Sequence, residues 1–296
     1  PQLEALGLVA DDMAKVAALM KVNSGDFRGY VEGTAPGKRG IPLLAIPTTS
    51  GTGSEATATL VVTHKEMKTG ITHPFIMPDT ALVDPALTVS LPQRVTANTG
   101  MDALSHAIEA YMSQKNNTFA DAVALQSMRL ISDNIRLAYA QGGNIEARAH
   151  MAMGSMLGGL SIANSSTCGG HALAYGFAVM KSLPHGFTCA MALPFIMEYN
   201  MLAIPERLAD VAEALGEDTS GMHPREAAYE AVNAVARLNH DLGIPLGLEE
   251  LGAKHDEIPK MADETMRIGR LLSINPRSMN REEAVRVFER MWHGFE

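Results

Sequence analysis

The pattern of apolar residues changes near residue 90, and no other feature of the sequence constrains the fold as strongly. Before that point, short apolar runs are separated by Gly, Pro and Thr: IPLLAIP at 41–47, TATLVVT at 57–63 and TALVDP at 80–85. Runs of this length between turn-forming residues predict buried strands of an α/β region. Beyond that point, apolar residues stand three or four apart with few breakers, as in 119–140 and 225–243, which predicts helices.

The sequence therefore predicts an α/β domain over residues 1–90 and an all-helical domain over residues 91–296. A chain of 296 residues has room for both, since domains usually hold about 100 to 200 residues. No apolar run approaches the length of about 18 residues that a membrane helix needs, so we expect no membrane partner.

The net charge and the cysteine content limit which binding partners and which cellular compartment are expected. The chain has 24 basic and 33 acidic side chains, and a net charge of −9 repels a phosphodiester backbone. We therefore expect no nucleic acid partner. The two cysteines, Cys168 and Cys189, cannot form a disulfide framework, and PQLEALGLVA lacks the layout of a signal peptide. These features predict a reducing, cytoplasmic setting.

A loop rich in Gly, Ser and Thr, PTTSGTGSE at 47–55, follows the apolar run LLAI directly. Gly51 and Gly53 allow a tight turn, so that backbone N–H groups and hydroxyls could converge on a phosphate. The hydroxyls belong to Thr48, Thr49, Thr52 and Ser54. On composition alone, an ordinary polar loop explains the segment equally well.

Three segments place candidate metal ligands along the helical part. Asp102 and His106 stand four apart among helix-forming residues, so both side chains leave one face of a helix. The simpler alternative for such a pair is a helix N-cap with a structural histidine. His171 and His185 are fourteen residues apart and must come from different elements. Together the four side chains would form an N3O set suited to Fe2+ or Zn2+.

Several motifs in one order and spacing resemble the iron-containing (group III) alcohol dehydrogenases. They are PTTSGTGSE, LVDPALTVSLPQRVTANTGMDALSHAIEAY, HALAYGFAVMKSLPHG and ALPFIMEYN. The resemblance covers nearly the whole chain. It implies an N-terminal nucleotide-binding α/β domain, incomplete here, and a C-terminal all-helical metal-binding domain, with the active site in the cleft between them.

The resemblance also implies site residues, cofactors and a reaction. The implied metal ligands are Asp102, His106, His171 and His185, and the implied cofactor contacts are Thr48, Thr49, Thr52, Thr57 and Lys68. The implied cofactors are a divalent metal, Fe2+ before Zn2+, and NAD or NADP. The implied activity is hydride transfer between the nicotinamide and a small alcohol or aldehyde, in a homodimer or a larger homo-oligomer.

Two departures from the family pattern concern the surroundings of the ion. Many members have a second His four residues after the first, and here Tyr175 takes that position. We expect Tyr175 to act in catalysis by donating a hydrogen bond to a substrate oxygen, with a packing aromatic as the alternative. The usual small residues before His171 are replaced by SSTCGG at 165–170, and we expect Cys168 and the surroundings of Phe177 to line the cavity.

A third departure concerns the nucleotide. The family has a GGGS turn ahead of a helix that would match DDMAKVAALM, and this sequence has none. We expect that a stretch of the nucleotide domain is missing between about Val9 and Asp11; the alternative, a natural deletion, would leave a dinucleotide poorly held. Other functions stay open: a relative of glycerol dehydrogenase, a metal-independent relative of maleylacetate reductase, or a noncatalytic metal-binding protein.

Overall fold

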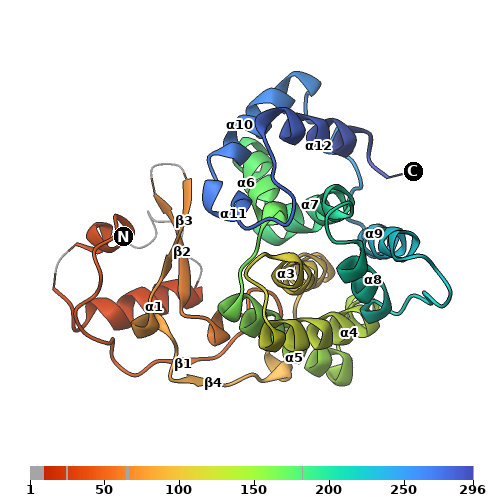
Figure 1. The fold of residues 1–296 in the computed structure, drawn as a ribbon. Helices are drawn as coiled ribbons and strands as arrows, with labels where there is room; N and C mark the ends of the chain where they lie inside the picture. The colour runs from red at the N-terminus through yellow and green to blue at the C-terminus, as the bar shows by residue number, and fades with distance from the viewer. Residues whose placement is uncertain (1–9, 25, 65–66, 182, 296) are drawn as a thin grey trace.

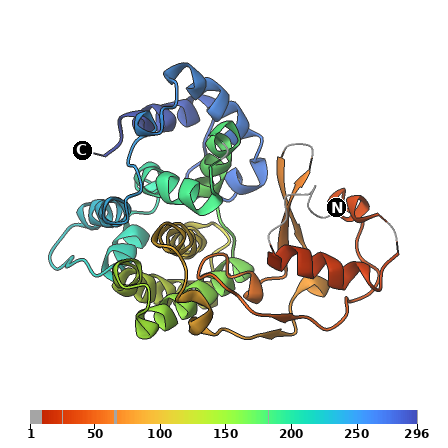
Figure 2. The ribbon, with the colours of Figure 1, turned by 180° about the vertical axis from the view of Figure 1, so that it is seen from behind.

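The chain forms two parts that lie side by side. The computed structural model describes residues 10–24, 26–64, 67–181 and 183–295, with the backbone alone at 10, 11, 63, 64, 67–69 and 179–181. In Figure 1, the red and orange N-terminal elements lie to one side and the helices from α3 (Gln93–Met112) onward lie to the other. Figure 2 shows the same arrangement from behind.

A β-hairpin and a helix form the centre of the N-terminal part. Strands β2 (Thr59–His64) and β3 (Met67–Thr72) pair antiparallel, and helix α1 (Ala10–Met20) packs against β2. The small apolar core between them includes Val16, Leu19, Leu60, Val62 and Ile76. The remaining elements of this part are α2 (Phe27–Val31), η2 (Ser54–Ala56), η3 (Pro74–Ile76) and η4 (Pro85–Thr88).

The strands predicted at 41–47 and 80–85 are shorter and more exposed than expected. Only β1 (Leu44–Ala45) and β4 (Thr80–Ala81) form there, as a parallel pair. Leu44 is 54% exposed, and β4 is exposed at both residues. The prediction of buried strands was wrong here because, among the described residues, this sheet has two short strands, in which only Ala45 is buried.

The helical part confirms the predicted periodicity. The segments predicted at 119–140 and 225–243 form α4 (Thr118–Ala140) and α9 (Pro224–Asp241). No helix in the described part of the chain is long and apolar enough to cross a membrane. The other elements are α5 (Ile145–Asn164), α6 (Gly169–Lys181), α7 (His185–Asn200), α8 (Pro205–Ala214), η5 (Glu249–Leu251), η6 (His255–Glu257), α10 (Ile258–Met266), α11 (Gly269–Leu272) and α12 (Arg281–His293).

Helix α3 is the central element of the helical part. It packs against α4, α5 and α7, and it is buried almost continuously from Thr96 to Met112. Gly100 permits the close approach to α4, because a Cβ there would lie 2.7 Å from Ile135 Cδ1. The buried Arg148 on α5 donates a hydrogen bond to Thr96 Oγ1 over 2.8 Å. These contacts hold the side chains of α3 in fixed positions.

The Gly-rich loop at 47–55 packs directly against helices α3 and α5. Gly53 has a left-handed backbone with φ of 60°, and a Cβ on it would lie 2.5 Å from Gly159 Cα on α5. A Cβ on Gly51 would lie 2.8 Å from Thr99 Cβ on α3. On the other side, the Lys15 ammonium donates to backbone oxygens of Ser54, Thr57 and Thr59 over 2.7 to 3.0 Å. The loop is thus fixed between α1 on one side and helices α3 and α5 on the other.

Candidate metal centre

Three helices deliver the four predicted ligands to one place. Asp102 and His106 lie within α3, His171 lies in the first turn of α6, and His185 is the first residue of α7. Asp102 is therefore not an N-cap, and the simpler reading of its pairing with His106 is wrong. Helix α7 starts at His185 because Pro184 precedes it as the N-cap, and Gly186 lets its first turn approach α3.

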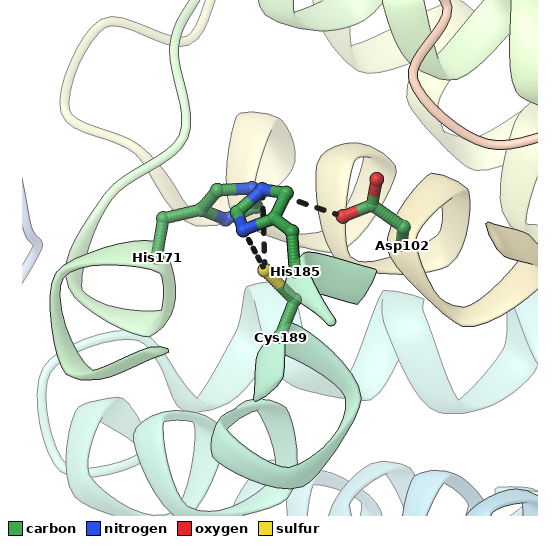
Figure 3. A group of neighbouring side chains, drawn as sticks. All are labelled: Asp102, His171, His185 and Cys189. Atoms are coloured by element: carbon green, nitrogen blue, oxygen red, sulfur yellow. Dashed lines mark hydrogen bonds and ion pairs between the residues drawn. The ribbon is translucent and has the colours of Figure 1, made fainter. Parts of the chain in front are cut away.

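The side chains of Asp102, His171 and His185 converge, and Cys189 joins them (Figure 3). One donor atom from each of the four lies within 4.8 Å of the others. His185 Nε2 lies 3.8 Å from Asp102 Oδ1, and the rings of His171 and His185 are 5.2 Å apart. Sequence reasoning missed Cys189, although it stands one helical turn after His185.

His106 borders this group on the side of the Gly-rich loop. Its Nε2 lies 4.0 Å from Asp102 Oδ1, and its ring stacks on that of His171 at 5.0 Å. Burial lowers the pKa of His106, while the Asp102 carboxylate and the Gly51 backbone act in the opposite direction. His106 is thus adjacent to the centre, neutral, and in contact with both the loop and a predicted ligand.

Glu109 is a buried carboxylate that sequence reasoning also missed. Its Oε1 lies 2.5 Å from His171 Nδ1, and its Oε2 accepts hydrogen bonds from the backbone N–H groups of Cys168 and His171, over 2.7 and 3.2 Å. A carboxylate can only accept, so Nδ1 of His171 carries the proton. In the neutral imidazole, the lone pair of His171 Nε2 is then left for another partner, such as a cation.

The buried charges of the centre stabilise one another. Burial alone would raise the pKa of Asp102, but His106, His185 and His171 outweigh it and hold that pKa below its usual value. Burial would lower the pKa of His171, but Glu109 outweighs it and raises the pKa. Burial raises the pKa of the Cys189 thiol, and Asp102 raises it further. The centre therefore holds two carboxylates at neutral pH.

Tyr175 lies beside the imidazoles of His171 and His185. Its ring stacks on that of His185 at 5.3 Å and meets that of His171 edge-on at 6.2 Å. Burial raises the pKa of its hydroxyl. Phe177, in contrast, packs in the core against Phe288, and Cys168 lies behind Glu109. Of the three residues expected in the cavity wall, Tyr175 is the one that faces the centre.

The predicted cofactor contacts divide into two groups. Thr48 is exposed and Thr49 and Thr52 are partly exposed, so their hydroxyls can reach a ligand above the loop. Thr57 is buried, and its hydroxyl instead contacts Ser54 O, Thr59 O and the Lys15 ammonium. Thr57 thus supports the loop. Lys68 belongs to β3, and its side chain lies outside the described residues.

The donor chemistry of the centre fits a divalent cation. Among the described residues, Asp102 Oδ1 and His171 Nε2 are buried and have no hydrogen-bond partner. Leaving such atoms unpaired costs about 1 to 3 kcal/mol each, so a folded protein is expected to provide a partner. A carboxylate oxygen and imidazole nitrogens within a few ångströms of one another are suitable ligands for Fe2+ or Zn2+.

Comparison with known families decides the identity. The family model described as "Iron-containing alcohol dehydrogenase" matches residues 9–85, and "Fe-containing alcohol dehydrogenase family, C-terminal" matches residues 96–292. The chain belongs to the iron-containing alcohol dehydrogenase family. The resemblance seen in the motifs is confirmed, and with it the fold class and the assignment as a metal-dependent oxidoreductase.

Two relatives illustrate the level of similarity within this family. Long-chain-alcohol dehydrogenase 1 of Geobacillus thermodenitrificans is 38% identical over 286 residues, which are 96% of this chain and 72% of the relative. The 1,3-propanediol dehydrogenase of Citrobacter freundii is 38% identical over 279 residues, 94% of this chain and 72% of the relative. This chain therefore spans about 72% of the length of either relative.

Solved structures of the family superimpose closely. A crystal structure of 1,3-propanediol oxidoreductase matches with a TM-score of 0.90 at 37% identity, covering 94% of this chain and 73% of that one. The sulfoacetaldehyde reductase of Bifidobacterium kashiwanohense, solved in complex with NAD+, matches with a TM-score of 0.87 at 28% identity, covering 95% and 73%. The fold described above is thus that of the family.

Proposed function

We propose that this alcohol dehydrogenase interconverts a small alcohol and its aldehyde with NAD or NADP, at the centre formed by α3, α6 and α7. The observation that supports it most is the pair of buried, unpartnered atoms, Asp102 Oδ1 and His171 Nε2, beside His185. Relatives named for 1,3-propanediol, methanol and sulfoacetaldehyde support a small substrate.

Asp102, His171 and His185 would hold the ion, with His106 beside them as the fourth ligand that the resemblance implies. When bound, the ion supplies Lewis acidity at the substrate oxygen and the nicotinamide supplies or accepts the hydride. Fe2+ is the ion that the family name indicates, and Zn2+ suits the same donors.

Neighbouring side chains would prepare the centre for this chemistry. Glu109 fixes the ring of His171 and keeps its proton on Nδ1. The aromatic ring of Tyr175 stacks on that of His185, whose side chain is 39% exposed, and shields one face of the imidazole from water. With a reference pKa near 10, the Tyr175 hydroxyl stays protonated at neutral pH and can donate a hydrogen bond to a substrate oxygen.

The dinucleotide would bind along the loop at 47–55. Thr48, Thr49 and Thr52 would present hydroxyls to it, and the resemblance implies Lys68 of β3 as a further contact. The loop touches α3 at Thr99, one turn before Asp102, so a nicotinamide held by it lies next to the ion. The sequence has no GGGS turn ahead of DDMAKVAALM, so the hydroxyls of this loop would be the main contacts of the phosphates.

The two parts of the chain would have separate functions. We propose a nucleotide-binding domain over residues 1–90 and a metal-binding catalytic domain over residues 91–296. We also propose a cytoplasmic homodimer or larger homo-oligomer. Exposed apolar side chains near β1 and β4, including Ile41, Leu44 and Leu82, support association because a second copy could cover them. Light scattering that gives a monomeric mass at micromolar concentration would contradict it.

Turnover of NADH and NADPH with a panel of short aldehydes, before and after loading with Fe2+ or Zn2+, tests the function. We expect metal-dependent oxidation of one of the two nucleotides. Absence of turnover in protein that binds both an ion and a reduced nucleotide would contradict the proposal. Titration of the nucleotide by fluorescence separates a weak cofactor site from a failed reaction, and stoichiometric ion excludes the metal-independent alternative.

A further inference from the structure

The sulfur of Cys189 faces the same point as the proposed ligands, on a helix that already contributes one of them. We propose that Cys189 is a further donor to the ion, so that the centre binds its metal through oxygen, nitrogen and sulfur. This inference rests on the ion site of the proposed function and adds a ligand to it. The roles proposed for Asp102, His171 and His185 are unchanged.

Helix geometry brings the thiol to the centre. Because α7 begins at His185, Cys189 lies one turn further along on the same face. Its Sγ is 3.6 Å from His185 Nε2 and 3.7 Å from Nδ1. Figure 3 shows the sulfur below the two imidazole rings, with Asp102 at the side.

The spacing of the donors is close to that of a metal shell. Donors bonded at about 2.0 to 2.3 Å in a tetrahedral site stand about 3.3 to 3.7 Å apart. The observed set lies within 4.8 Å, so its widest pair has to approach by about 1 Å when an ion binds. Rotations about side-chain bonds can provide this movement without displacing α3 or α7.

Two buried atoms at this point are independent evidence for a ligand, because within the described part of the chain they accept no hydrogen bond. Asp102 and His171 are 4% and 2% exposed, and among the described residues Asp102 Oδ1 and His171 Nε2 have no hydrogen-bond partner. Cys189 is 1% exposed, and its sulfur lies within 4.8 Å of donor atoms of Asp102, His171 and His185. A cation there would satisfy the oxygen, the nitrogen and the sulfur together.

Coordination requires that the thiol lose its proton. The S–H bond breaks, the proton passes to solvent, and the sulfur lone pair forms the bond to the ion. A thiolate is a soft donor, so it favours Zn2+ more than an all-oxygen-and-nitrogen set does. We therefore expect the Cys189 sulfur to shift the preference of this centre toward Zn2+.

Substitution with Co2+ tests the assignment by spectroscopy, with no need for turnover. A thiolate bound to Co2+ produces a strong charge-transfer band in the near ultraviolet, which oxygen and nitrogen ligands do not. Cys168→Ser is the matched control, because Cys168 is the other cysteine of the chain and lies behind Glu109. We expect the band in the wild type and in Cys168→Ser, and its loss in Cys189→Ser.

Each outcome decides the question. One bound Co2+ per wild-type chain without the band, or a band that persists in a folded Cys189→Ser, overturns the proposal. If Cys189→Ser does not fold, the band in Cys168→Ser still assigns the sulfur, because it leaves Cys189 as the only cysteine. Failure of the wild type to bind Co2+ would instead overturn the ion site itself. Folded Cys189→Ser should also bind Zn2+ at least about tenfold more weakly.

Discussion

The contact between Glu109 and His171 predicts a measurable effect on metal affinity. Glu109→Gln keeps the shape of the side chain and removes its charge. The carboxylate accepts three hydrogen bonds, one from His171 Nδ1 through Oε1 and two from backbone N–H groups through Oε2. An amide has a single acceptor oxygen, so either the imidazole or the two backbone groups must face an NH2 group.

The expected magnitude follows from these contacts. Loss of a carboxylate behind a metal-binding histidine typically costs 10- to 100-fold in affinity, which is about 1.4 to 2.7 kcal/mol. We expect the Kd of the ion to rise by this factor in Glu109→Gln. If the NH2 group faces the ring, His171 must move its proton to Nε2, and the lone pair intended for the ion is lost. The effect should then lie at the upper end.

Competition with a chromogenic chelator measures the Kd of Zn2+ or Co2+, and 15N NMR of the metal-free protein reports the tautomer of His171. Cys168→Ala is the control, because Cys168 also contacts Glu109 and its replacement removes no hydrogen-bond acceptor from His171. Far-ultraviolet circular dichroism confirms the fold of each variant. The reasoning is refuted if folded Glu109→Gln binds the ion as tightly as Cys168→Ala and retains the proton on Nδ1.

Four further predictions address the ion, the loop and the substrate. His171→Ala or His185→Ala should remove most bound ion and activity with little loss of helix, and unchanged metal content in both variants would contradict the ligand assignment. Gly53→Ala places a Cβ 2.5 Å from α5 on a left-handed backbone that costs about 1 to 2 kcal/mol; we expect weaker NADH binding at unchanged metal content, measured by calorimetry. Lys15→Met leaves several buried oxygens without a donor, so the free energy of unfolding measured in urea should fall by about 3 kcal/mol. An unchanged free energy of unfolding would show that the hydrogen bonds of Lys15 are dispensable. Tyr175→Phe should lower turnover modestly, and Tyr175→His should move the pH optimum of turnover to lower pH, because an imidazole with a pKa near 6.5 titrates there; wild-type pH profiles in both would make Tyr175 structural.

Helical periodicity made the larger part of the fold predictable. The spacing of apolar residues located α4 and α9 to within two residues at each end. The strands were less predictable, because a short apolar run does not reveal how many neighbours will pair with it. At 41–47, pairing extends over Leu44 and Ala45, and the other side chains have no strand beside them among the described residues.

The site was predictable in part, for reasons of spacing. Asp102, His106 and Glu109 follow the helical period, so the sequence did contain a signal for the buried Glu109 that we did not use. Cys189 was harder to find, because its relation to His185 depends on the exact start of α7. The convergence of His171 with His185 was proposed from the donor set that they complete with Asp102 and His106 and then implied by the family resemblance, since contacts between separate helices are not encoded in local spacing.

The main chains of Gly53 and Gly159 lie in direct contact, and this contact limits how substitutions can alter the enzyme. Because no side chain separates the loop from α5, the distance between them is set by van der Waals contact of the backbone. That distance cannot shorten, and any larger residue at either position lengthens it. At the proposed site, a nicotinamide held by this loop would therefore keep its position relative to the ion when residues elsewhere on the surface are substituted. Substitutions around Tyr175 and Cys189 could then change the substrate preference while the path of the hydride kept its length.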